Sequence, residues 1–131
     1  MASTFARRAL ARLNDPSDRR CVACVCLALV AFELAFCGVI VAKVPYTEID
    51  WIAYMEEVHG YARGERNYAK LAGGTGPLVY PAGFVYVYRA LYALVGGLER
   101  GVSPSGVRTA QLAFALVYAV NQSVVFLVYA A

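Results

Sequence analysis

Charged side chains are scarce in this sequence. Asp, Glu, Lys and Arg make up 16% of its 131 residues, against about a quarter in soluble domains, whereas hydrophobic residues make up 60%. The net charge is only +3, and the basic residues form no stripe interleaved with aromatics of the kind that a nucleic-acid groove needs. The composition therefore argues against a nucleic-acid partner and against an ordinary soluble domain.

The few charges are also unevenly placed, in the first twenty residues and in the stretches 43–70 and 99–108. Between them lie apolar stretches of the roughly 20 residues that cross a bilayer as a helix. Three such stretches in one short chain are hard to cover with what remains of it. We therefore predict an all-α integral membrane protein with about three transmembrane helices. The expected spans are 21–42, 77–98 and 110–131.

The last of these spans has no polar flank, because the sequence is still apolar where it stops at Ala131. We therefore expect the chain to be the N-terminal piece of a longer protein.

Basic residues before the first span indicate its orientation. Residues 1–20 carry five arginines against two aspartates, which places the N-terminus in the cytoplasm by the positive-inside rule. The loop 45–76 then lies outside the cytoplasm, and the stretch 99–108, with Arg100 and Arg108, returns to it. An Arg-rich, acid-free start is also typical of a mitochondrial transit peptide. The long apolar run that follows favours an uncleaved signal anchor.

Ligand sets for metals and nucleotides are missing. The pair Cys21 and Cys24 has zinc or redox spacing, but no second ligand pair follows it. The glycines of the segment 73–76 resemble a phosphate-binding loop, but no Lys-Ser/Thr follows, which excludes a Walker site. A structural hinge into the second span is the alternative. No metal and no cofactor are predicted.

The loop 45–76 is more ordered in its chemistry than a passive linker. Thr47 and Asp50 have the spacing of a capping box, with Asp50 as the third helical residue. Apolar residues then recur at helical spacing. They predict an interfacial amphipathic helix with Trp51 and Tyr54 at headgroup depth.

Asp50 has two possible roles. As a cap it would only satisfy a helix terminus. As a site residue it would be a carboxylate at the mouth of a membrane cavity, beside Trp51, which could pack on a sugar. Chemistry on a lipid-linked substrate needs such a base at the interface, because the reactive headgroup lies there.

Two motifs carry a resemblance to a known family: YTEIDW at 46–51 and TGPLVYPAGFVY at 75–86. Together they resemble the dolichyl-phosphate-mannose-dependent α-1,3-mannosyltransferases of the endoplasmic reticulum, and the similarity extends over roughly 44–130. The resemblance implies a polytopic fold of the GT-C type with its active site on the lumenal side. It also implies a dolichyl phosphate mannose donor and a dolichol-linked oligosaccharide acceptor.

The resemblance further implies roles for residues of the loop. Asp50 takes the position of an essential acid, with Glu48 as its neighbour, and would act as the base of an inverting transfer that needs no bound metal. The candidate substrate-binding residues are Trp51, His59, Arg63 and Tyr80. Arg66 and Lys70 are further candidates for the donor phosphate, with solvated loop charges as the alternative for these cations and for His59 and Arg63.

The sequence departs from the family at two positions. An acidic residue usually precedes TGPLVYPAG, where this chain has Gly74, and Arg89 falls within a span that is generally uncharged. The alternatives are a sister transferase that uses the same donor, or a truncated, non-catalytic membrane protein. The 131 residues alone are predicted to be inactive, since three spans cannot enclose both substrates.

Overall fold

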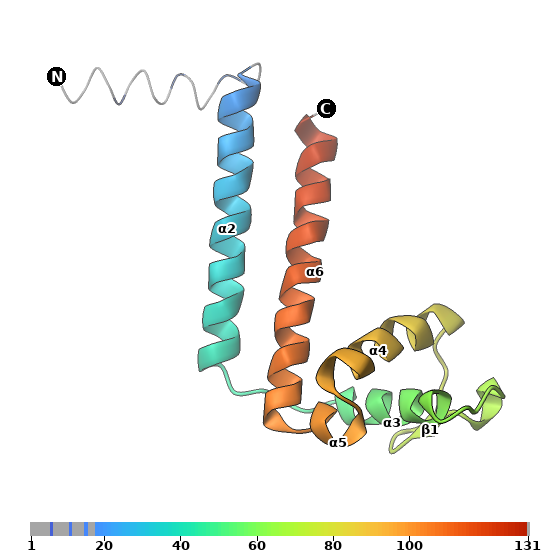
Figure 1. The fold of residues 1–131 in the computed structure, drawn as a ribbon. Helices are drawn as coiled ribbons and strands as arrows, with labels where there is room; N and C mark the ends of the chain where they lie inside the picture. The colour runs from blue at the N-terminus through green and yellow to red at the C-terminus, as the bar shows by residue number, and fades with distance from the viewer. Residues whose placement is uncertain (1–5, 7–10, 12–14, 16–17, 131) are drawn as a thin grey trace. The chain divides into compact units, whose positions relative to one another are not determined.

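The computed structural model describes residues 6, 11, 15 and 18–130 and consists mainly of helices (Figure 1). The chain divides into two compact units: Met1–Ile40 with Ala115–Ala131, and Val41–Phe114. Three of the arginines used to orient the N-terminus, Arg7, Arg8 and Arg12, lie outside the described residues.

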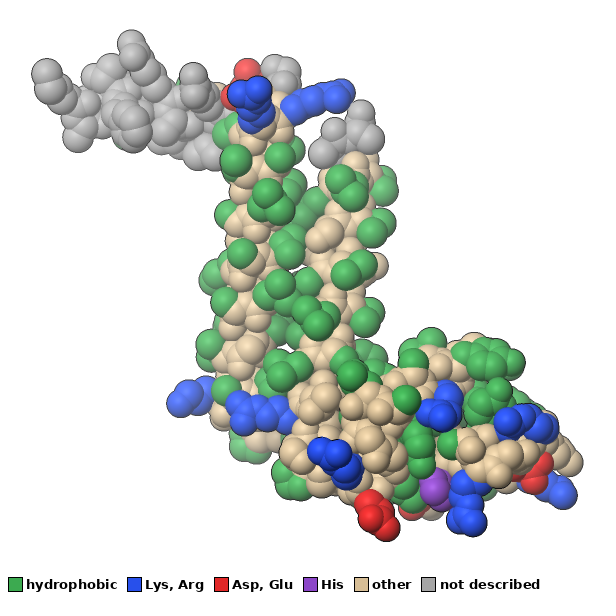
Figure 2. Space-filling view, in the orientation of Figure 1, with side chains coloured by type: hydrophobic (Ala, Val, Ile, Leu, Met, Phe, Trp, Pro, Cys, Tyr) green, Lys and Arg blue, Asp and Glu red, His purple; other side chains and the backbone are tan. Residues whose placement is uncertain are grey.

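Helix α2 (Arg19–Lys43) corresponds to the first predicted span. It starts where Oδ1 of Asp18 accepts a hydrogen bond from the backbone N–H of Cys21 at 3.1 Å. Its 25 residues give a length of about 37 Å at 1.5 Å per residue, enough to cross a bilayer. Hydrophobic side chains cover it along its length, and basic side chains lie at both ends (Figure 2).

Helix α6 (Pro104–Ala130) is the second helix long and apolar enough to cross a membrane. It begins six residues earlier than predicted, because Oγ of Ser103 accepts a hydrogen bond from the N–H of Gly106 at 3.3 Å and Pro104 suits the first helical position. In the unit that holds its C-terminal part, the hydroxyl of Tyr118 donates a hydrogen bond to the carboxylate of Glu33.

The spanning helix predicted over 77–98 is not confirmed. Helix α4 (Ala82–Val95) has 14 residues, or about 21 Å, which is shorter than the roughly 30 Å of a bilayer's hydrocarbon core. Pro81 precedes its first residue, and Gly96 ends it in the left-handed conformation at φ 86°. Such a backbone suits only glycine, so the apolar pattern continues past a point where the helix stops.

Helices α3 (Trp51–Ala62), α4 and the short α5 (Leu98–Gly101) pack together in the second unit. Met55 and Val58 of α3 are completely buried, and Trp51 is 8% exposed. These are the side chains that were expected to meet lipid. Trp51 and Met55 pack in a protein core instead, because α4 and the start of α6 supply apolar partners for them.

A small hairpin lies against α3. After a 3₁₀ turn (Tyr68–Lys70), strand β1 (Ala72–Gly73) pairs antiparallel with β2 (Gly76–Pro77). A Cβ atom on Gly73 would overlap the backbone carbonyl of Ala53, so only glycine permits this approach. The N–H of Gly74 donates to Oε2 of Glu56 at 2.6 Å. The glycine-rich segment therefore docks a hairpin on the helix, rather than acting as a hinge.

Candidate functional site

Asp50 directly precedes α3 and is its N-cap residue, yet its side chain makes no capping hydrogen bond. The hydroxyl of Tyr54, one turn further, donates to Oδ2 of Asp50 at 3.3 Å. The predicted capping box with Thr47 is wrong, because the helix begins at Trp51 and Asp50 stands outside it. The carboxylate of Asp50 therefore does not cap the start of α3. It accepts a hydrogen bond from the phenol of Tyr54 instead.

Glu48 provides the helix-terminal contact that was expected of Asp50. Its Oε1 accepts a hydrogen bond from the backbone N–H of Ile52 at 3.0 Å, a donor without a partner inside the helix. Its Oε2 accepts one from the hydroxyl of Tyr46 at 2.7 Å. Burial and this hydrogen bond raise the pKa of Tyr46, so the phenol keeps its proton. Both oxygens of Glu48 are thus engaged with the chain.

Tyr80 and Tyr54 join the Asp50 site from opposite elements. Their hydroxyl oxygens lie 2.9 Å apart, which extends the hydrogen-bonded chain from Asp50 to Tyr80, two residues before α4. The hydrogen bond with Tyr80 is the main cause that raises the pKa of Tyr54, followed by burial and the charge of Asp50. Tyr54 therefore stays neutral and keeps a proton to donate to the carboxylate.

Stacked rings hold these phenols in place. Tyr80, Phe84 and Tyr88 stack along α4 with centroid distances of 4.7 and 4.1 Å, and the ring of Tyr54 meets all three edge-on at 5.1–5.5 Å. We call these four residues the aromatic cluster. Edge-to-face and offset-stacked pairs each add to stability beyond the area that they bury. The aromatic cluster holds the ring of Tyr54 in place, and Tyr54 is the hydrogen-bond partner of Asp50.

Trp51 is not available to a sugar. Its indole N–H donates to the backbone carbonyl of Gly101 at 3.0 Å, and its ring lies 6.1 Å from that of Tyr88. The side chain connects α3 to α5 in the core. The structure thus gives Trp51 a packing role, whereas the sequence suggested that it lines the site.

Glu57 is a buried carboxyl group that the sequence did not single out. It lies in α3, seven residues beyond Asp50, and is 3% exposed. Its Oε2 has no hydrogen-bond partner among the residues that the structure describes. Burial, and to a lesser extent the charge of Asp50, raise the pKa of Glu57. In the sequence, only the spacing of seven residues could have placed Glu57 on the same side as Asp50. Helical spacing alone does not reveal whether other elements bury a side chain.

The residues predicted to bind the donor phosphate differ in their exposure and in their hydrogen bonds within the chain. Nδ1 of His59 lies 2.6 Å from the hydroxyl of Tyr92. Arg66 donates to the backbone carbonyl of Tyr61 at 2.7 Å and lies over its ring, so this guanidinium holds the loop. Arg63 and Lys70 are exposed. Of these residues, Arg63, Lys70 and the outer edge of His59 are open to a ligand.

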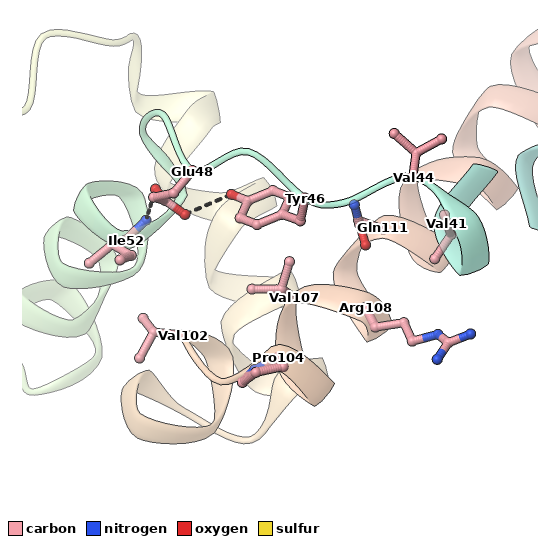
Figure 3. Close-up of a pocket in the computed structure, with 10 residues that line it drawn as sticks. All are labelled: Val41, Val44, Tyr46, Glu48, Ile52, Val102, Pro104, Val107, Arg108 and Gln111. Atoms are coloured by element: carbon pink, nitrogen blue, oxygen red, sulfur yellow. Dashed lines mark hydrogen bonds between the residues drawn. The ribbon is translucent and has the colours of Figure 1, made fainter.

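A pocket of about 400 Å³ lies beside Glu48 in the second unit. Figure 3 shows Glu48 on one wall, hydrogen-bonded to Tyr46 and Ile52, and the guanidinium of Arg108 extending away from it. The walls are mainly apolar, and the lining also includes the amide of Gln111. The residues that line it are Val41, Val44, Tyr46, Glu48, Ile52, Val102, Pro104, Val107, Arg108 and Gln111.

The site has the groups that a sugar ligand and a proton transfer require. Asp50 is a half-buried carboxylate, the hydroxyl of Tyr54 donates to it, and the hydroxyl of Tyr80 is hydrogen-bonded to that of Tyr54. A carboxylate oriented in this way can accept a proton from a hydroxyl group. Among the described residues, no three His, Cys, Asp or Glu side chains gather as ligands for a metal ion.

The similarity of this chain to known proteins extends beyond the loop 45–76. The family described as ALG3 protein matches residues 27–131. A relative from Arabidopsis thaliana, named Dol-P-Man:Man(5)GlcNAc(2)-PP-Dol alpha-1,3-mannosyltransferase, is 47% identical over 78% of this chain and 22% of its own length. Relatives of the same name from Neurospora crassa and Homo sapiens are 45% and 46% identical, over 91% and 82% of this chain and 23% and 22% of their own lengths.

No solved structure matches the chain. The chain spans only about a fifth of the length of these relatives, and that fifth contains both the Asp50 site and the hairpin against α3. Since the family match covers residues 27–131, which is most of the sequence, the chain belongs to the ALG3 protein family.

Proposed function

We propose that the full-length protein transfers mannose from dolichyl phosphate mannose to Man5GlcNAc2-PP-dolichol in α-1,3 linkage. The relatives carry this donor, acceptor and linkage in their names. The observation that carries the proposal for this chain is the carboxylate of Asp50, which is free of the helix terminus and oriented by Tyr54. The 131 residues alone are proposed to be inactive.

In the proposed reaction, the sugar is transferred in one displacement with inversion at the anomeric carbon. Asp50 accepts the proton of the acceptor 3-hydroxyl as its oxygen attacks, and dolichyl phosphate leaves with the electrons of the broken bond. Tyr54 donates to the carboxylate and keeps it in one orientation, and Tyr80 is hydrogen-bonded to Tyr54. Exposed cations of the loop, Arg63 first among them, would stabilise the departing phosphate.

The proposed location is the endoplasmic reticulum membrane, with residues 1–20 in the cytoplasm and the loop 45–76 in the lumen. Because α4 is too short to cross, we extend the lumenal segment through α5 to the start of α6. This revises the sequence-based expectation that 99–108 returns to the cytoplasm. The catalytic loop and the pocket beside Glu48 would then share the lumenal boundary.

The experiment uses cells that lack their own enzyme and accumulate lipid-linked Man5GlcNAc2. The full-length protein is expected to extend this glycan by one α-1,3-linked hexose, and its Asp50→Asn variant is expected not to. The matched control is Glu99→Gln, which neutralises an exposed acid of α5 in the same unit. Full activity of Asp50→Asn would refute Asp50 as the base.

The same assay separates the alternatives. Elongation of a later glycan intermediate, with Man5GlcNAc2 left unchanged, would indicate a sister transferase with the same donor. No elongation by the wild-type protein, despite normal expression in the membrane, would favour a non-catalytic membrane protein.

A further inference from the structure

The turn of the hairpin holds a carboxylate that comes from α3. Oε2 of Glu56 accepts the 2.6 Å hydrogen bond from the backbone N–H of Gly74, between strands β1 and β2. A Cβ atom built on Gly74 would meet this oxygen at 3.3 Å and, neighbouring residues aside, no other described atom within 4 Å. The carboxylate of Glu56 therefore occupies the place that a side chain at position 74 would take.

The backbone does not require glycine at position 74. Gly76, two residues further, has a φ of 123°, in the region where glycine is favoured, but Gly74 is not among the glycines with positive φ. Position 74 is also where the sequence departs from the family, which usually has an acid there. This chain thus lacks a carboxylate on the turn itself and has one from α3 in the same place.

One oxygen of Glu56 is open to a ligand. Oε1 has no hydrogen-bond partner among the described residues, and none of the described lysines and arginines pairs with this carboxylate. The side chain is partly exposed. A carboxylate only accepts hydrogen bonds, so it suits the hydroxyl groups of a carbohydrate. Because the bond to Gly74 already fixes the side chain, binding such a ligand costs less conformational entropy.

Glu56 and the candidate base Asp50 lie at a distance that suits a glycan. They are six residues apart, which corresponds to about 9 Å along the axis of α3 at 1.5 Å per residue. The hairpin also connects them, since β2 leads within three residues to Tyr80, whose hydroxyl is bonded to that of Tyr54 beside Asp50. The proposed donor carries a single mannose, whereas the proposed acceptor has several sugar units that can reach both carboxylates.

We propose that Glu56 is a second acid of the transfer site and binds hydroxyl groups of the acceptor glycan through Oε1. It takes, from α3, the place of the acid that the family usually has before TGPLVYPAG. This inference rests on the proposed function, because it assumes that the full-length protein binds a dolichol-linked oligosaccharide. Asp50 acts on the hydroxyl that reacts, and Glu56 holds hydroxyl groups of other sugar units.

Equilibrium binding of radiolabelled Man5GlcNAc2-PP-dolichol to the full-length protein in nanodiscs, with no donor present, tests the proposal. Glu56→Gln keeps an oxygen that can accept the hydrogen bond from Gly74 but removes the charge. Its Kd for the acceptor is expected to rise about ten-fold, because hydrogen bonds to charged groups are the stronger ones. Its thermal unfolding midpoint should stay at the wild-type value. Glu99→Gln, at an exposed acid of α5, is the matched control and should bind as the wild type does.

Moving the carboxylate to the turn separates the role of the charge from that of a structural contact. Glu56→Ala is expected to weaken binding as Glu56→Gln does. Adding Gly74→Asp to Glu56→Ala should bring the Kd back to within about three-fold of the wild type. Adding Gly74→Asn instead supplies a side chain of the same shape without the charge, and it should not restore binding.

Wild-type affinity in Glu56→Gln would overturn the proposal, and so would equal recovery with Gly74→Asp and Gly74→Asn, since either result leaves only a structural contact. If Glu56→Gln unfolds early, the two double variants decide. Weaker binding of dolichyl phosphate mannose with unchanged binding of the acceptor would overturn the assignment as well. A wild-type protein that binds the acceptor but transfers no mannose would contradict the proposed function alone, whereas no acceptor binding would overturn both.

Discussion

Glu48 and Asp50 lie two residues apart and carry the same charge, but they have different partners. Glu48 accepts hydrogen bonds from the backbone of Ile52 and from Tyr46, so it is part of the helix start. The carboxylate of Asp50 accepts one hydrogen bond from the described part of the chain, from the hydroxyl of Tyr54. A carboxylate has about four lone-pair sites, and Asp50 has more of them left for an incoming proton, with one oxygen not bonded in the described chain, which favours Asp50 over Glu48 as the base.

The bond from Tyr54 to Asp50 gives the first prediction. Tyr54→Phe removes the hydroxyl but keeps the ring in the aromatic cluster, so the loop should fold while the carboxylate loses its partner. Since such a hydrogen bond is worth about 1 kcal/mol, kcat/KM of the full-length enzyme is expected to fall roughly five-fold.

Tyr86→Phe is the control, because Tyr86 also lies on an aromatic-rich part of α4 but is 64% exposed. Measured on purified protein with a lipid-linked acceptor, equal kcat/KM values for the two variants would contradict the orienting role of Tyr54.

Glu57 gives a prediction about stability and pH. Its pKa is raised in the folded protein above the ordinary value of 4.5, so the folded state binds the proton more tightly than the unfolded state does. The stabilisation from this group is therefore complete below pH 4.5 and is lost as the pH rises through the folded pKa, at no more than about 1.4 kcal/mol per pH unit.

Glu57→Gln removes this titration and keeps the shape of the side chain. The variant is expected to gain thermal stability relative to the wild type as the pH is raised, with the two curves converging in acid. The measurement is the unfolding midpoint in detergent across a pH series, with exposed Glu99→Gln as the control. A constant difference at all pH values would mean that Glu57 does not titrate in this range.

At the scale of elements, the sequence predicted where helices occur better than where they end or what packs against them. A helix covers the first predicted span, and it is long and apolar enough to cross a membrane, because the apolar run and its flanking charges agree there. The second span was predicted too long, since the apolar run passes through Pro77, which pairs in a strand, and Gly96, which ends the helix. Hydropathy does not register backbone conformation, so a proline in a hairpin and a left-handed glycine were read as helix.

The surroundings of α3 were also outside the reach of sequence patterns. The apolar spacing predicted this helix correctly. The same spacing does not distinguish whether lipid or protein covers the apolar face of the helix. The covering elements, α4 and the start of α6, lie more than twenty residues further along the chain. The candidate site shows the same division: Asp50 and Tyr80 were singled out, whereas the buried Glu57 required the fold.

The contact between the hairpin and α3 gives a prediction at this scale. Gly73→Ala would place a Cβ atom against the carbonyl of Ala53, and backbone on both sides cannot yield easily. We expect a loss of about 1–3 kcal/mol of stability, as for other overpacked contacts.

Gly83→Ala is the matched control, because a Cβ at Gly83 meets no atom within 4 Å. Alanine suits a helix better than glycine, so this variant should unfold at the same temperature as the wild type or slightly above it. Thermal unfolding of both full-length variants in detergent measures the difference. Equal midpoints would show that the hairpin does not approach α3 as closely as described.

For the whole molecule, the number of spans decides which segments share a compartment. Among the described residues, α2 and α6 are the two helices long and apolar enough to cross, and two spans at these helices would put everything between them on one side of the membrane. Three spans would instead put 45–76 and 99–108 on opposite sides. The length of α4, about 21 Å, favours the first arrangement, and so does the short connection from α5 into α6.

Cysteine labelling of the full-length protein tests this arrangement. With the native cysteines replaced by alanine, single cysteines are introduced as Ser3→Cys, Arg63→Cys and Glu99→Cys, and sealed microsomes are treated with a membrane-impermeant maleimide. Ser3→Cys is expected to react from outside, whereas Arg63→Cys and Glu99→Cys, both exposed in the structure, should react only after the membrane is opened. Reaction of Glu99→Cys in sealed vesicles, with Arg63→Cys protected, would restore the third span. It would also separate α5 from the lumenal compartment in which we place Asp50.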